Sequence, residues 1–575
     1  MKNVNFEYAA IEKAISQQTD ASGKPIDVAG QCVMAQLAAY VAILAAEHEA
    51  GASLAEILED EDDASREFLL AAFDESWLGV ALALSSRFTK EELGGFALAY
   101  GTYVDERSSR AGASACGTPA CVSDLALALL DVSAGDSLAD LGCGRGDFLA
   151  RVAVAHPEAA LGGLELCEPL VCLARVRLRL LGRDSDIRVG DMLSGADTRT
   201  FDRVFSNYPF GLRCKDVSGE GAYYEACRSG RGGYGHPMSL DWVFNQAIYD
   251  SLAPGGRAVA VMLSATTCNG SDKGARKHFV EGGMVQAVVA LPAGLFPYTG
   301  LSTVLIVLGR NDGLIRLVDA ADLASKGRRR NIMEDADIAE ALQRYAGEGD
   351  HSRLVPRQEI AANDYSLLPA QYLGRQIELV NATPLGDLAV SIGRGAMLKA
   401  SELDALATDE DTGSCYLRLS DIADGSIGTD LPRIREIDPK LEKHCLRTGD
   451  LLISKNGAPF RVAVAEVAED QAILANGNLY IIRLDTARID PYFVAAFLAS
   501  EDGGELFARA TVGTAIPNLP LRNLRGIQVP VPDMQTQRAV ANRYKERLAE
   551  IGDLKRRLQA LRESASSTYG EMMGR

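Results

Sequence analysis

The sequence has no hydrophobic run long enough to cross a bilayer. Its longest apolar stretch near the N-terminus, residues 35–46, is shorter than the roughly 20 residues that a membrane-spanning helix needs. No basic segment with a cleavage site precedes this stretch. We therefore expect no membrane association and no export, and we predict a cytoplasmic protein.

Cysteine pairs with metal-binding spacing are also missing. The eleven cysteines contain no CxxC motif, and the closest pairs, Cys116 with Cys121 and Cys167 with Cys172, fit no zinc site. We interpret the cysteines as reduced thiols, several of them small core residues, and we predict no metal site.

Basic residues are outnumbered by acidic ones. Lysine and arginine number 59 against 78 aspartates and glutamates, so the formal net charge is −19. Because phosphate contacts depend on lysine and arginine, this balance argues against nonspecific coating of DNA. An acidic protein can still have a basic cleft, so this charge is compatible with a protein that binds a specific nucleic-acid sequence.

Motifs of motors and nucleases are absent too. The chain has no GxxxxGKS/T phosphate loop and no convincing constellation of acidic residues and lysine for a nuclease. A nuclease activity, if one accompanies this chain, would therefore come from a separate subunit.

The length and composition are those of an ordinary multidomain protein. At 575 residues the chain exceeds the size at which one hydrophobic core stops growing, so we expect two to four domains. We predict an N-terminal helical domain at residues 1–110, an α/β domain at 111–311, a connector at 312–380, an α+β domain at 381–532 and a C-terminal helix at 533–575.

The first 110 residues have a helical pattern. They are rich in alanine, contain proline only at Pro25, and place apolar residues at helical spacing. The acidic run at residues 56–63 is interpreted as a solvated loop or helix end without chemistry.

Short apolar runs alternate with helical patterns between residues 111 and 311, which is typical of βαβ units and a mainly parallel sheet. The connection at 292–302 has no room for a crossover helix, so the seventh strand is predicted to return antiparallel beside the sixth. The expected strands are residues 137–141, 160–166, 187–189, 203–206, 257–263, 285–291 and 303–308.

The later segments have other patterns. The connector contains a basic cluster at residues 326–330, which a solvated loop explains better than a phosphate contact. The helix after Pro532 has an apolar, coiled-coil-like seam that needs a packing partner. The seam consists of Val540, Tyr544, Leu548, Ile551, Leu554, Leu558 and Leu561.

A glycine-rich loop follows the first expected strand. Asp140 ends the strand, and Gly142, Gly144 and Gly146 follow in a turn that leads into a helix. Glycine lets the backbone approach a ligand closely, and the helix N-terminus offers free N–H groups. The loop therefore predicts a cofactor site, although nucleotide dehydrogenases use related loops.

Two acidic residues end the next two strands. Glu165, with Glu168 as the alternative, is placed to bind the ribose hydroxyls of a cofactor. Asp191 is placed to accept a hydrogen bond from an adenine amino group. A surface glutamate and a turn aspartate are the plainer explanations, but the glycine loop in register favours the ribose role of Glu165.

The tetrapeptide Asn207-Tyr208-Pro209-Phe210 closes the fourth expected strand. An aromatic amine is a poor nucleophile because its lone pair is delocalised, so a catalyst must draw both N–H bonds toward acceptors. The Asn207 side-chain oxygen and the Tyr208 main-chain carbonyl are the expected acceptors. Pro209 would hold the turn rigid, and Phe210 would stack on the target base.

With the glycine loop, this tetrapeptide predicts a site that binds S-adenosylmethionine and transfers its methyl group to a planar amino nitrogen. Asn207 is expected to contact the cofactor as well as the target. The alternative is an ordinary Asn-x-Pro turn after a strand.

The order of these motifs resembles the amino-methylating DNA methyltransferases, and in detail the modification subunit of type I restriction systems. Thr118-Pro119 resembles the segment that precedes the glycine loop in that family. Further similar stretches are residues 234–237, 241–244 and 291–296.

This resemblance covers about residues 111–308. It implies a seven-stranded, Rossmann-like methyltransferase fold that uses S-adenosylmethionine, with Thr118 and Pro119 among the cofactor contacts. It also implies adenine N6 of a flipped base as the methyl acceptor. Tyr208 departs from the family, which usually has a second proline there. Because a main-chain carbonyl is the group supplied, we expect activity to survive.

Residues 384–532 resemble a target-recognition domain of a type I specificity subunit, through the stretches 416–422, 448–457, 513–519 and 527–532. The resemblance implies that the final helix is a spacer between half-sites. For any one candidate DNA contact, a turn or solvated residue is about as well supported. The candidates are Lys455, Asn456, Arg461, Thr514, Asn518 and Arg522.

The leading hypothesis is a sequence-specific adenine N6 methyltransferase of double-stranded DNA in a restriction-modification or related epigenetic or defence system. A single recognition unit predicts a homodimer through the C-terminal helix, while a monomer that reads an asymmetric site stays open. Methylation of cytosine N4, RNA or a glutamine side chain are alternatives. Another alternative is a catalytically weak DNA-binding or assembly subunit, because Tyr208 stands where the family usually has a proline.

Overall fold

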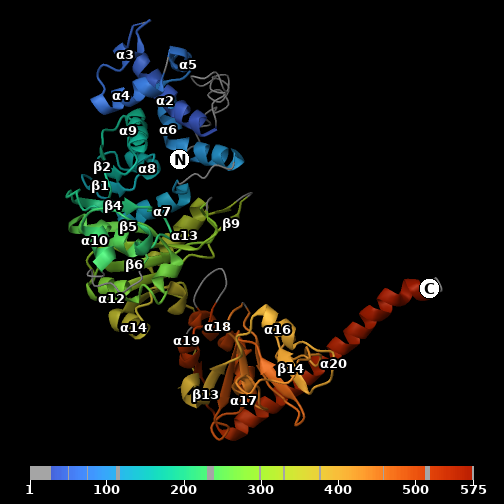
Figure 1. The fold of residues 1–575 in the computed structure, drawn as a ribbon. Coiled ribbons are helices and arrows are strands. Elements are labelled where there is room, and N and C mark those ends of the chain that lie inside the picture. Colours follow the sequence, from blue (N-terminus) through green and yellow to red (C-terminus); the bar gives the residue numbers. More distant parts are fainter. Residues whose placement is uncertain are drawn as a thin grey trace. The chain divides into compact units, whose positions relative to one another are not determined.

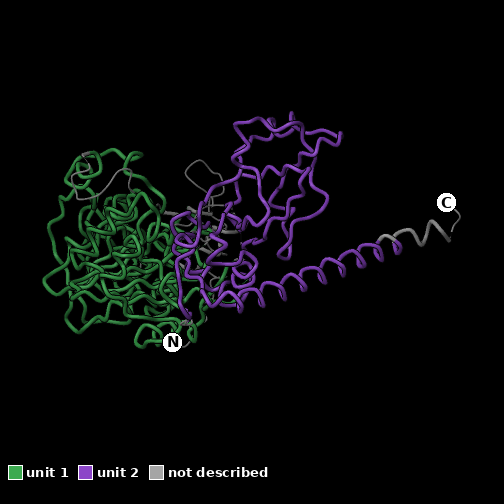
Figure 2. The backbone as a smooth tube through the Cα atoms, turned by 90° about the horizontal axis from the view of Figure 1, so that it is seen from below, with its two compact units in different colours: residues 1–373 green, residues 374–575 purple. Residues whose placement is uncertain are grey.

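The chain divides into two compact units, residues 1–373 and 374–575, drawn green and purple in Figure 2. Each is described by itself. The computed structural model describes residues 28–49, 51–73, 75–111, 117–229, 239–296, 299–327, 330–374, 377, 379–457, 459–511 and 518–572.

A helical bundle forms the N-terminal part of unit 1 (Figure 1). Its core is built on the long apolar helix α2, where Leu37 and Val41 are fully buried against Trp77 and Phe96 from later helices. The helices are α2 (Val28–Ala45), α3 (Leu54–Ile57), α4 (Asp63–Ala72), α5 (Glu75–Ser85) and α6 (Lys90–Ala111).

The acidic run at residues 56–63 contributes to packing rather than only to a solvated surface. Glu61 and Asp62 both pair with Arg179 of helix α9 (Glu168–Leu180), Asp62 at 2.6 Å. Asp62 also caps helix α4 by accepting from the Ser65 main-chain N–H. The run therefore connects the helical bundle to the α/β part of unit 1.

A mixed sheet of nine strands forms the centre of unit 1, in the order β11-β8-β6-β7-β5-β4-β1-β2-β3. All seven expected strands are present, and β7 lies antiparallel between β5 and β6. The sheet has nine strands rather than seven because β8 and β11, from the segment expected to be a connector, extend it beyond β6. The strands are β1 (Ser137–Leu141), β2 (Ala160–Glu165), β3 (Asp186–Val189), β4 (Phe201–Ser206), β5 (Leu252–Leu263), β6 (Val285–Ala290), β7 (Thr303–Leu308), β8 (Leu314–Asp319) and β11 (Ser352–Pro356).

Both faces of this sheet are buried because successive side chains point to opposite faces. In β5, Ala260 and Met262 belong to one hydrophobic core, and Val259 and Val261 belong to the other. Helix α9 and the helices α7 (Ala120–Leu130), α8 (Asp147–Ala155) and α13 (Asp335–Ala346) contribute to the second core. Helices α10 (Ala222–Ser229), α11 (Asp241–Asp250), α12 (Lys273–Glu281) and α14 (Arg357–Ala362) contribute to the first.

Short elements complete unit 1. Within the expected basic cluster, Lys326 lies in a two-residue strand, and Arg328 and Arg329 lie outside the described residues. The short elements are η1 (Cys214–Asp216), η2 (Ser264–Thr267), β9 (Ser325–Lys326), β10 (Asn331–Ile332) and η3 (Pro369–Gln371).

Unit 2 is built on a four-stranded antiparallel sheet in the order β13-β20-β17-β18. Its strands are β13 (Ala389–Arg394), β17 (Leu451–Ser454), β18 (Val462–Val464) and β20 (Leu479–Leu484). Three further strand pairs surround it: β14 (Ser414–Leu417) with β19 (Ala472–Ala475), β15 (Ile422–Ala423) with β16 (Ser426–Ile427), and β12 (Thr383–Pro384) with β21 (Gln528–Val529). The helices are α15 (Leu385–Leu388), α16 (Ala400–Leu406), η4 (Leu419–Asp421), η5 (Glu442–His444), α17 (Pro491–Leu498), α18 (Glu501–Ala510), α19 (Leu521–Gly526) and α20 (Met534–Met572).

The two halves of helix α20 have different surroundings. In the first half, Gln537 and Ala541 are buried against the rest of unit 2. In the second half, Leu554, Leu558 and Leu561 are exposed, by 56%, 49% and 68%. The helix extends away from the rest of its unit there (Figure 2), so the expected apolar seam is only partly covered.

The described part of the chain lacks two kinds of feature, a single membrane-spanning helix and a metal-binding cluster. There, no single helix is long and apolar enough to cross a membrane, although α4 and α5, which meet at a bend of 107°, together reach such a length and composition. The same residues contain no cluster of three or more histidine, cysteine, aspartate or glutamate side chains that could hold a metal ion. The ten described cysteines are free thiols.

Candidate active site

A cavity of about 630 Å³ lies in unit 1. It is lined by the carboxyl ends of β1, β2 and β4 and by the loops that follow them, which is where open α/β sheets bind ligands. Its volume falls within the range of about 300–1,000 Å³ that small-molecule sites have. Cys32, Val33 and Tyr100 of the helical bundle also line it, so the bundle contributes one wall.

The glycine loop lies between β1 and α8 and forms one side of the cavity. Gly142, Gly144 and Gly146 have φ angles of 87°, 52° and 77°, a region that side chains disfavour. A Cβ atom on Gly142 or Gly144 would meet no atom within 4 Å, so the backbone there is open to a ligand. A Cβ atom on Gly146 would lie 3.2 Å from Cβ of Ala174, so this glycine lets helix α9 pack closely.

Glu165, at the end of β2, is hydrogen-bonded to the main chain of this loop. Its Oε2 accepts a hydrogen bond of 2.9 Å from the Gly144 main-chain N–H, and its Oε1 accepts one of 3.0 Å from Cys167. Glu165 lines the cavity, whereas the alternative Glu168 is exposed in the first turn of α9 and is absent from the lining.

Asp140 contributes a buried acceptor to the same cavity. It is 3% exposed, and its Oδ1 has no hydrogen-bond partner among the described residues. Burial raises the pKa of Asp140 well above its usual range, and the carboxylates of Glu165 and Asp147 raise it further. A cationic or hydrogen-bond-donating ligand would therefore stabilise the ionised form.

Asp191 follows β3 and lines the cavity, but its carboxylate already accepts two hydrogen bonds within the protein. Its Oδ1 accepts from the Leu193 main-chain N–H at 2.9 Å, and its Oδ2 accepts from the Tyr224 hydroxyl at 2.7 Å. Burial and this bond to Asp191 raise the pKa of Tyr224 to about 12. Each carboxylate oxygen keeps one further lone pair for a ligand.

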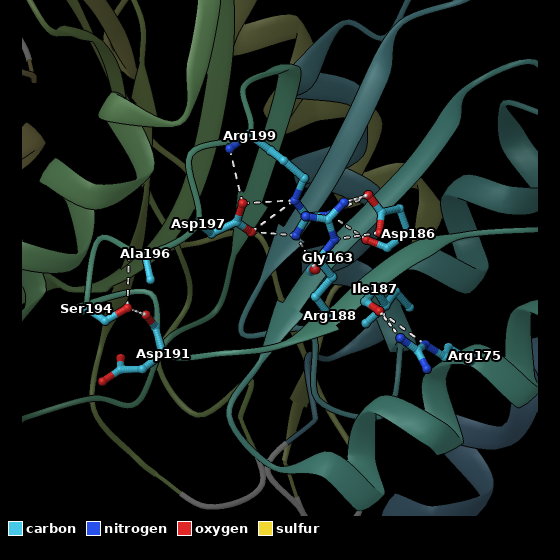
Figure 3. A network of polar contacts seen from close by, with 10 residues as sticks. All are labelled: Gly163, Arg175, Asp186, Ile187, Arg188, Asp191, Ser194, Ala196, Asp197 and Arg199. Carbon is cyan, nitrogen blue, oxygen red and sulfur yellow. Dashed lines mark hydrogen bonds and ion pairs between the residues drawn. The ribbon is translucent and has the colours of Figure 1, made fainter. Parts of the chain in front are cut away.

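Polar contacts hold the loop after Asp191 in place (Figure 3). Ser194 Oγ donates to the Asp191 main-chain oxygen at 2.7 Å. Arg199 pairs with Asp197 at 2.5 Å and with Asp186 at 2.9 Å, and it donates to the main-chain oxygen of Gly163 in β2 at 3.1 Å. The loop is thereby fixed to the strand edge that carries Glu165.

Asn207 follows β4 directly and is oriented by Thr118. Its Nδ2 donates to Thr118 Oγ1 at 3.0 Å. Its Oδ1 is buried and has no hydrogen-bond partner among the described residues. Leaving a buried amide oxygen unpaired costs about 1–3 kcal/mol, so this atom is an acceptor prepared for a donor that the described residues do not supply. Pro119, the other half of the Thr-Pro pair, caps helix α7 and is absent from the cavity lining.

The Tyr208 side chain is part of the protein core. It is 1% exposed, and its ring stacks on Phe244 with a centroid distance of 4.8 Å. Its hydroxyl donates to Asn245 Oδ1 at 3.3 Å. No described residue donates to the main-chain oxygen of Tyr208, so the expected acceptor is unoccupied while the side chain fills a core position.

Pro209 and Phe210 complete the tetrapeptide. Pro209 is exposed and lines the cavity. Phe210 is half-buried and contacts Phe296 edge to face, with a centroid distance of 5.5 Å. Phe210 is not part of the cavity lining. Phe296 belongs to the expected landmark at residues 291–296, while the landmark at 234–237 lies outside the described residues.

Several cavity residues have no counterpart in the sequence motifs. Leu212, Val217 and Tyr224 come from segments far from the glycine loop, and no local pattern indicates them. Arg145 also lines the cavity, and the sequence motif marks the glycines on either side of it rather than the arginine itself.

Three of the six expected DNA contacts lie together in unit 2. Asn518 Nδ2 donates to Asn456 Oδ1 at 2.8 Å, and these two residues form an isolated antiparallel bridge. The neighbouring Lys455 main-chain oxygen accepts from Leu519 at 2.8 Å.

The other three expected contacts differ from these. The Arg461 guanidinium donates to the main-chain oxygens of Leu419 and Ile422, at 2.6 and 2.7 Å, so it supports a loop. Arg522 is exposed in α19, and Thr514 lies outside the described residues.

Comparisons with known proteins agree on the first unit. Residues 98–379, 282 of the 575, match the family model described as N-6 DNA Methylase. The chain is 28% identical over 283 residues to the type I restriction enzyme MjaVII methylase subunit of Methanocaldococcus jannaschii, covering 44% of this chain and 48% of that protein. It is 25% identical over 284 residues to the MjaVIII methylase subunit of the same organism, covering 44% and 49%.

A solved structure shows the same fold. The methyltransferase subunit of the type I restriction-modification system of Streptococcus thermophilus matches with a TM-score of 0.50 at 20% identity, over 64% of this chain and 98% of that one. The chain spans about half the length of the curated relatives that it matches. The comparisons therefore establish the mixed α/β methyltransferase fold for the segment that carries the cavity.

Proposed function

We propose that this protein transfers a methyl group from S-adenosylmethionine to N6 of an adenine in double-stranded DNA, within a restriction-modification system. The observation that carries the proposal is the buried, unpaired Oδ1 of Asn207, which Thr118 orients beside a glycine-lined cavity. The family match over residues 98–379 and the methylase subunits of type I restriction enzymes support the same activity.

The residues present fit S-adenosylmethionine. Gly142 and Gly144 leave open backbone for its close approach, and Glu165 is held where it can accept from ribose hydroxyls. Asp140 offers a buried oxygen without a partner, suited to a cationic cofactor. The remaining lone pairs of Asp191 can accept from the adenine amino group. When bound, the cofactor supplies an electrophilic methyl group on its sulfonium.

The chain's own contribution is to orient and activate the target amine. Asn207 Oδ1 and the Tyr208 main-chain oxygen each accept one N–H bond, so that the nitrogen lone pair faces the methyl group. With the cofactor bound, the amine nitrogen would take the methyl group, the cofactor would leave as an uncharged thioether, and the proton of the amine would pass to solvent. The cavity holds a thiol, Cys143, but burial raises the pKa of that thiol well above its usual range, which does not suit a nucleophile.

The Tyr208 side chain is compatible with this activity. Catalysis needs its main-chain oxygen, and the ring lies in the core against Phe244. The packing of the Tyr208 ring against Phe244 therefore holds the turn in place, as the rigidity of a second proline would. Phe210, half-buried against Phe296, is proposed to stack on a base flipped out of the duplex, which contributes about 1–3 kcal/mol.

Unit 2 is proposed to be the target-recognition domain. Lys455, Asn456 and Asn518 lie together in the described structure, and Arg522 is exposed on α19. We propose that these residues, with Thr514, contact DNA, while Arg461 acts indirectly by holding the segment at residues 419–422. A separate restriction subunit would supply cleavage, and the complex would work in the cytoplasm.

The exposed apolar stripe at Leu554, Leu558 and Leu561 of α20 is proposed to pair with the same stripe of a second chain. A homodimer would carry two recognition domains at a fixed spacing and read a bipartite site.

The test is to incubate the full chain with methyl-labelled S-adenosylmethionine and duplex DNA, and then to sequence the product by a single-molecule method. Label in N6-methyladenine at one sequence supports the proposal. Label at cytosine N4 would replace adenine as the target. Intact cofactor binding without label in DNA would overturn the proposal in favour of an assembly subunit.

A further inference from the structure

The cavity has a basic residue at one end. Arg145 lies between Gly144 and Gly146, and its side chain is 13% exposed. Among the described residues that line the cavity, it is the sole lysine or arginine. The other charged lining residues are carboxylates, namely Asp140, Asp147, Glu165 and Asp191.

A second arginine shares a carboxylate with Arg145. Asp147 Oδ2 lies 3.0 Å from Nε of Arg145, and Asp147 Oδ1 lies 2.5 Å from Nη1 of Arg177, which is 1% exposed. One carboxylate thus serves two guanidinium groups. Burial alone would raise the pKa of Asp147, but the two arginines outweigh it and bring that pKa below its usual range. Two guanidinium groups thus share one carboxylate among the described residues, and a partly buried guanidinium group favours an anionic partner.

The position of the Arg145 guanidinium relates it to the transfer site. A Cβ atom on Gly117 would lie 2.4 Å from Arg145 Nη2, so the guanidinium lies directly against the main chain of Gly117. The next residue is Thr118, which holds Asn207. Arg145 therefore lies beside the segment that orients the methyl acceptor.

The sulfonium of S-adenosylmethionine joins three arms. On the function proposed above, the adenosyl arm extends toward Glu165 and Asp191, and the methyl group faces Asn207. The third arm ends in an α-ammonium and an α-carboxylate, and this carboxylate is the one anionic group of the molecule. Arg145 is the lining residue whose charge and planar donor geometry match a carboxylate.

We propose that Arg145 binds the α-carboxylate of the cofactor, and that Arg177 acts as a positioning residue by sharing Asp147 with it. This inference rests on the proposed use of S-adenosylmethionine. It adds a residue that selects the intact amino-acid end of the cofactor. It also explains a charged side chain inside a loop whose other positions are small.

The experiment compares two ligands that differ only in the carboxylate, S-adenosylmethionine and decarboxylated S-adenosylmethionine. Dissociation constants are measured by calorimetry for the full-length protein and for Arg145→Gln, Arg145→Lys and Arg151→Gln. Arg151 is the matched control because it lies in α8, pairs with Asp124 at 2.6 Å and does not line the cavity.

The unmodified protein is expected to prefer S-adenosylmethionine by about 10- to 100-fold, the range for hydrogen bonds between charged groups. Arg145→Gln should lose this preference while it still binds the decarboxylated ligand, which also shows that the pocket is folded. Arg145→Lys should keep part of the preference, and Arg151→Gln should keep all of it.

Two negative results have different meanings. If Arg145→Gln still prefers the carboxylated ligand as strongly as the unmodified protein, the role of Arg145 is wrong and the proposed function stands. If the unmodified protein binds neither ligand, the proposed function fails, and this inference fails with it.

Discussion

The Asn207 side-chain nitrogen donates to Thr118 Oγ1 across 3.0 Å, and this one bond determines which end of the amide faces the cavity. Thr118 precedes helix α7, and Asn207 follows strand β4, so the bond joins segments 89 residues apart. With the nitrogen engaged, Oδ1 becomes the buried acceptor. On the proposed function, the acceptor for the target amine is thus oriented before any substrate binds.

Asn207→Ala is expected to abolish methyl transfer and to leave S-adenosylmethionine binding nearly unchanged. The variant removes the proposed acceptor for the target amine, whereas the glycine loop and Glu165, which are proposed to hold the cofactor, are untouched. Single-turnover transfer to duplex DNA and calorimetric cofactor binding measure the two effects separately. Transfer at a similar rate in the variant would show that the site has been assigned to the wrong residue.

Thr118→Val should lower the single-turnover rate by about 10- to 100-fold, because the amide of Asn207 loses the bond that orients it and small misplacements of a catalytic group have effects of this size. Valine keeps the shape of threonine, so the fold should be retained. Thr299→Val provides a control, since Thr299 Oγ1 accepts only from the Leu301 main-chain N–H among the described residues, in an exposed loop. Equal rates for Thr118→Val and the unmodified protein would exclude the orienting role.

Local sequence patterns predicted the parts of the site that one strand and its following turn create. Asp140 and Glu165 lie at the carboxyl ends of strands, and Gly142, Gly144 and Asn207 come just after strand ends. Parallel strands bring such residues to the same edge of the sheet. The structure places all of them in one cavity. For these residues a periodic pattern and a short motif were sufficient.

Contacts between distant segments could not be predicted in this way. The engagement of Asp191 by Tyr224, the wall formed by Tyr100, and the use of Arg461 to hold main-chain oxygens all depend on tertiary packing. The two additional strands, β8 and β11, were missed because their segment is charged and mixed in pattern. The side-chain hydrogen bonds of Tyr224 and Arg461 join distant segments, and such contacts leave no periodic signal in the sequence.

Tyr208→Ala and Tyr208→Phe should separate the two roles of this residue. Removing the buried ring should destabilise unit 1 by about 3–5 kcal/mol, as truncation of large core side chains does. Phenylalanine keeps the stacking on Phe244 and loses only a hydroxyl bond of 3.3 Å, so stability should fall by about 0.5–1.5 kcal/mol. Transfer by Tyr208→Phe should match the unmodified protein. Loss of transfer in a stable Tyr208→Phe variant would show that the hydroxyl takes part in the reaction.

Homodimer formation should depend on the exposed half of α20. Replacing Leu558 and Leu561 with glutamate puts charge into the proposed seam, and because both side chains are exposed in the single chain, its fold should be unaffected. Sedimentation velocity should show a dimer that becomes a monomer in the double variant. Leu314→Glu, an equally exposed leucine in unit 1, should leave the dimer intact. A monomer for the unmodified protein at micromolar concentration would favour the reading of an asymmetric site.

The stability of unit 1 should fall as pH rises from about 4 to above 7, because of Asp241. Burial raises the pKa of this carboxyl to about 7, against about 3.9 in an unfolded chain. Between these two pH values the folded state binds the extra proton, so raising the pH weakens folding, by at most about 4 kcal/mol for a shift of this size. Asp241→Asn removes the titrating group and should flatten this part of the melting-temperature profile between pH 5 and pH 8. The amide can still accept from Thr266 Oγ1, which lies 3.4 Å from Asp241 Oδ2, so the variant is expected to fold. An unchanged pH profile in the variant would assign the titration to another group.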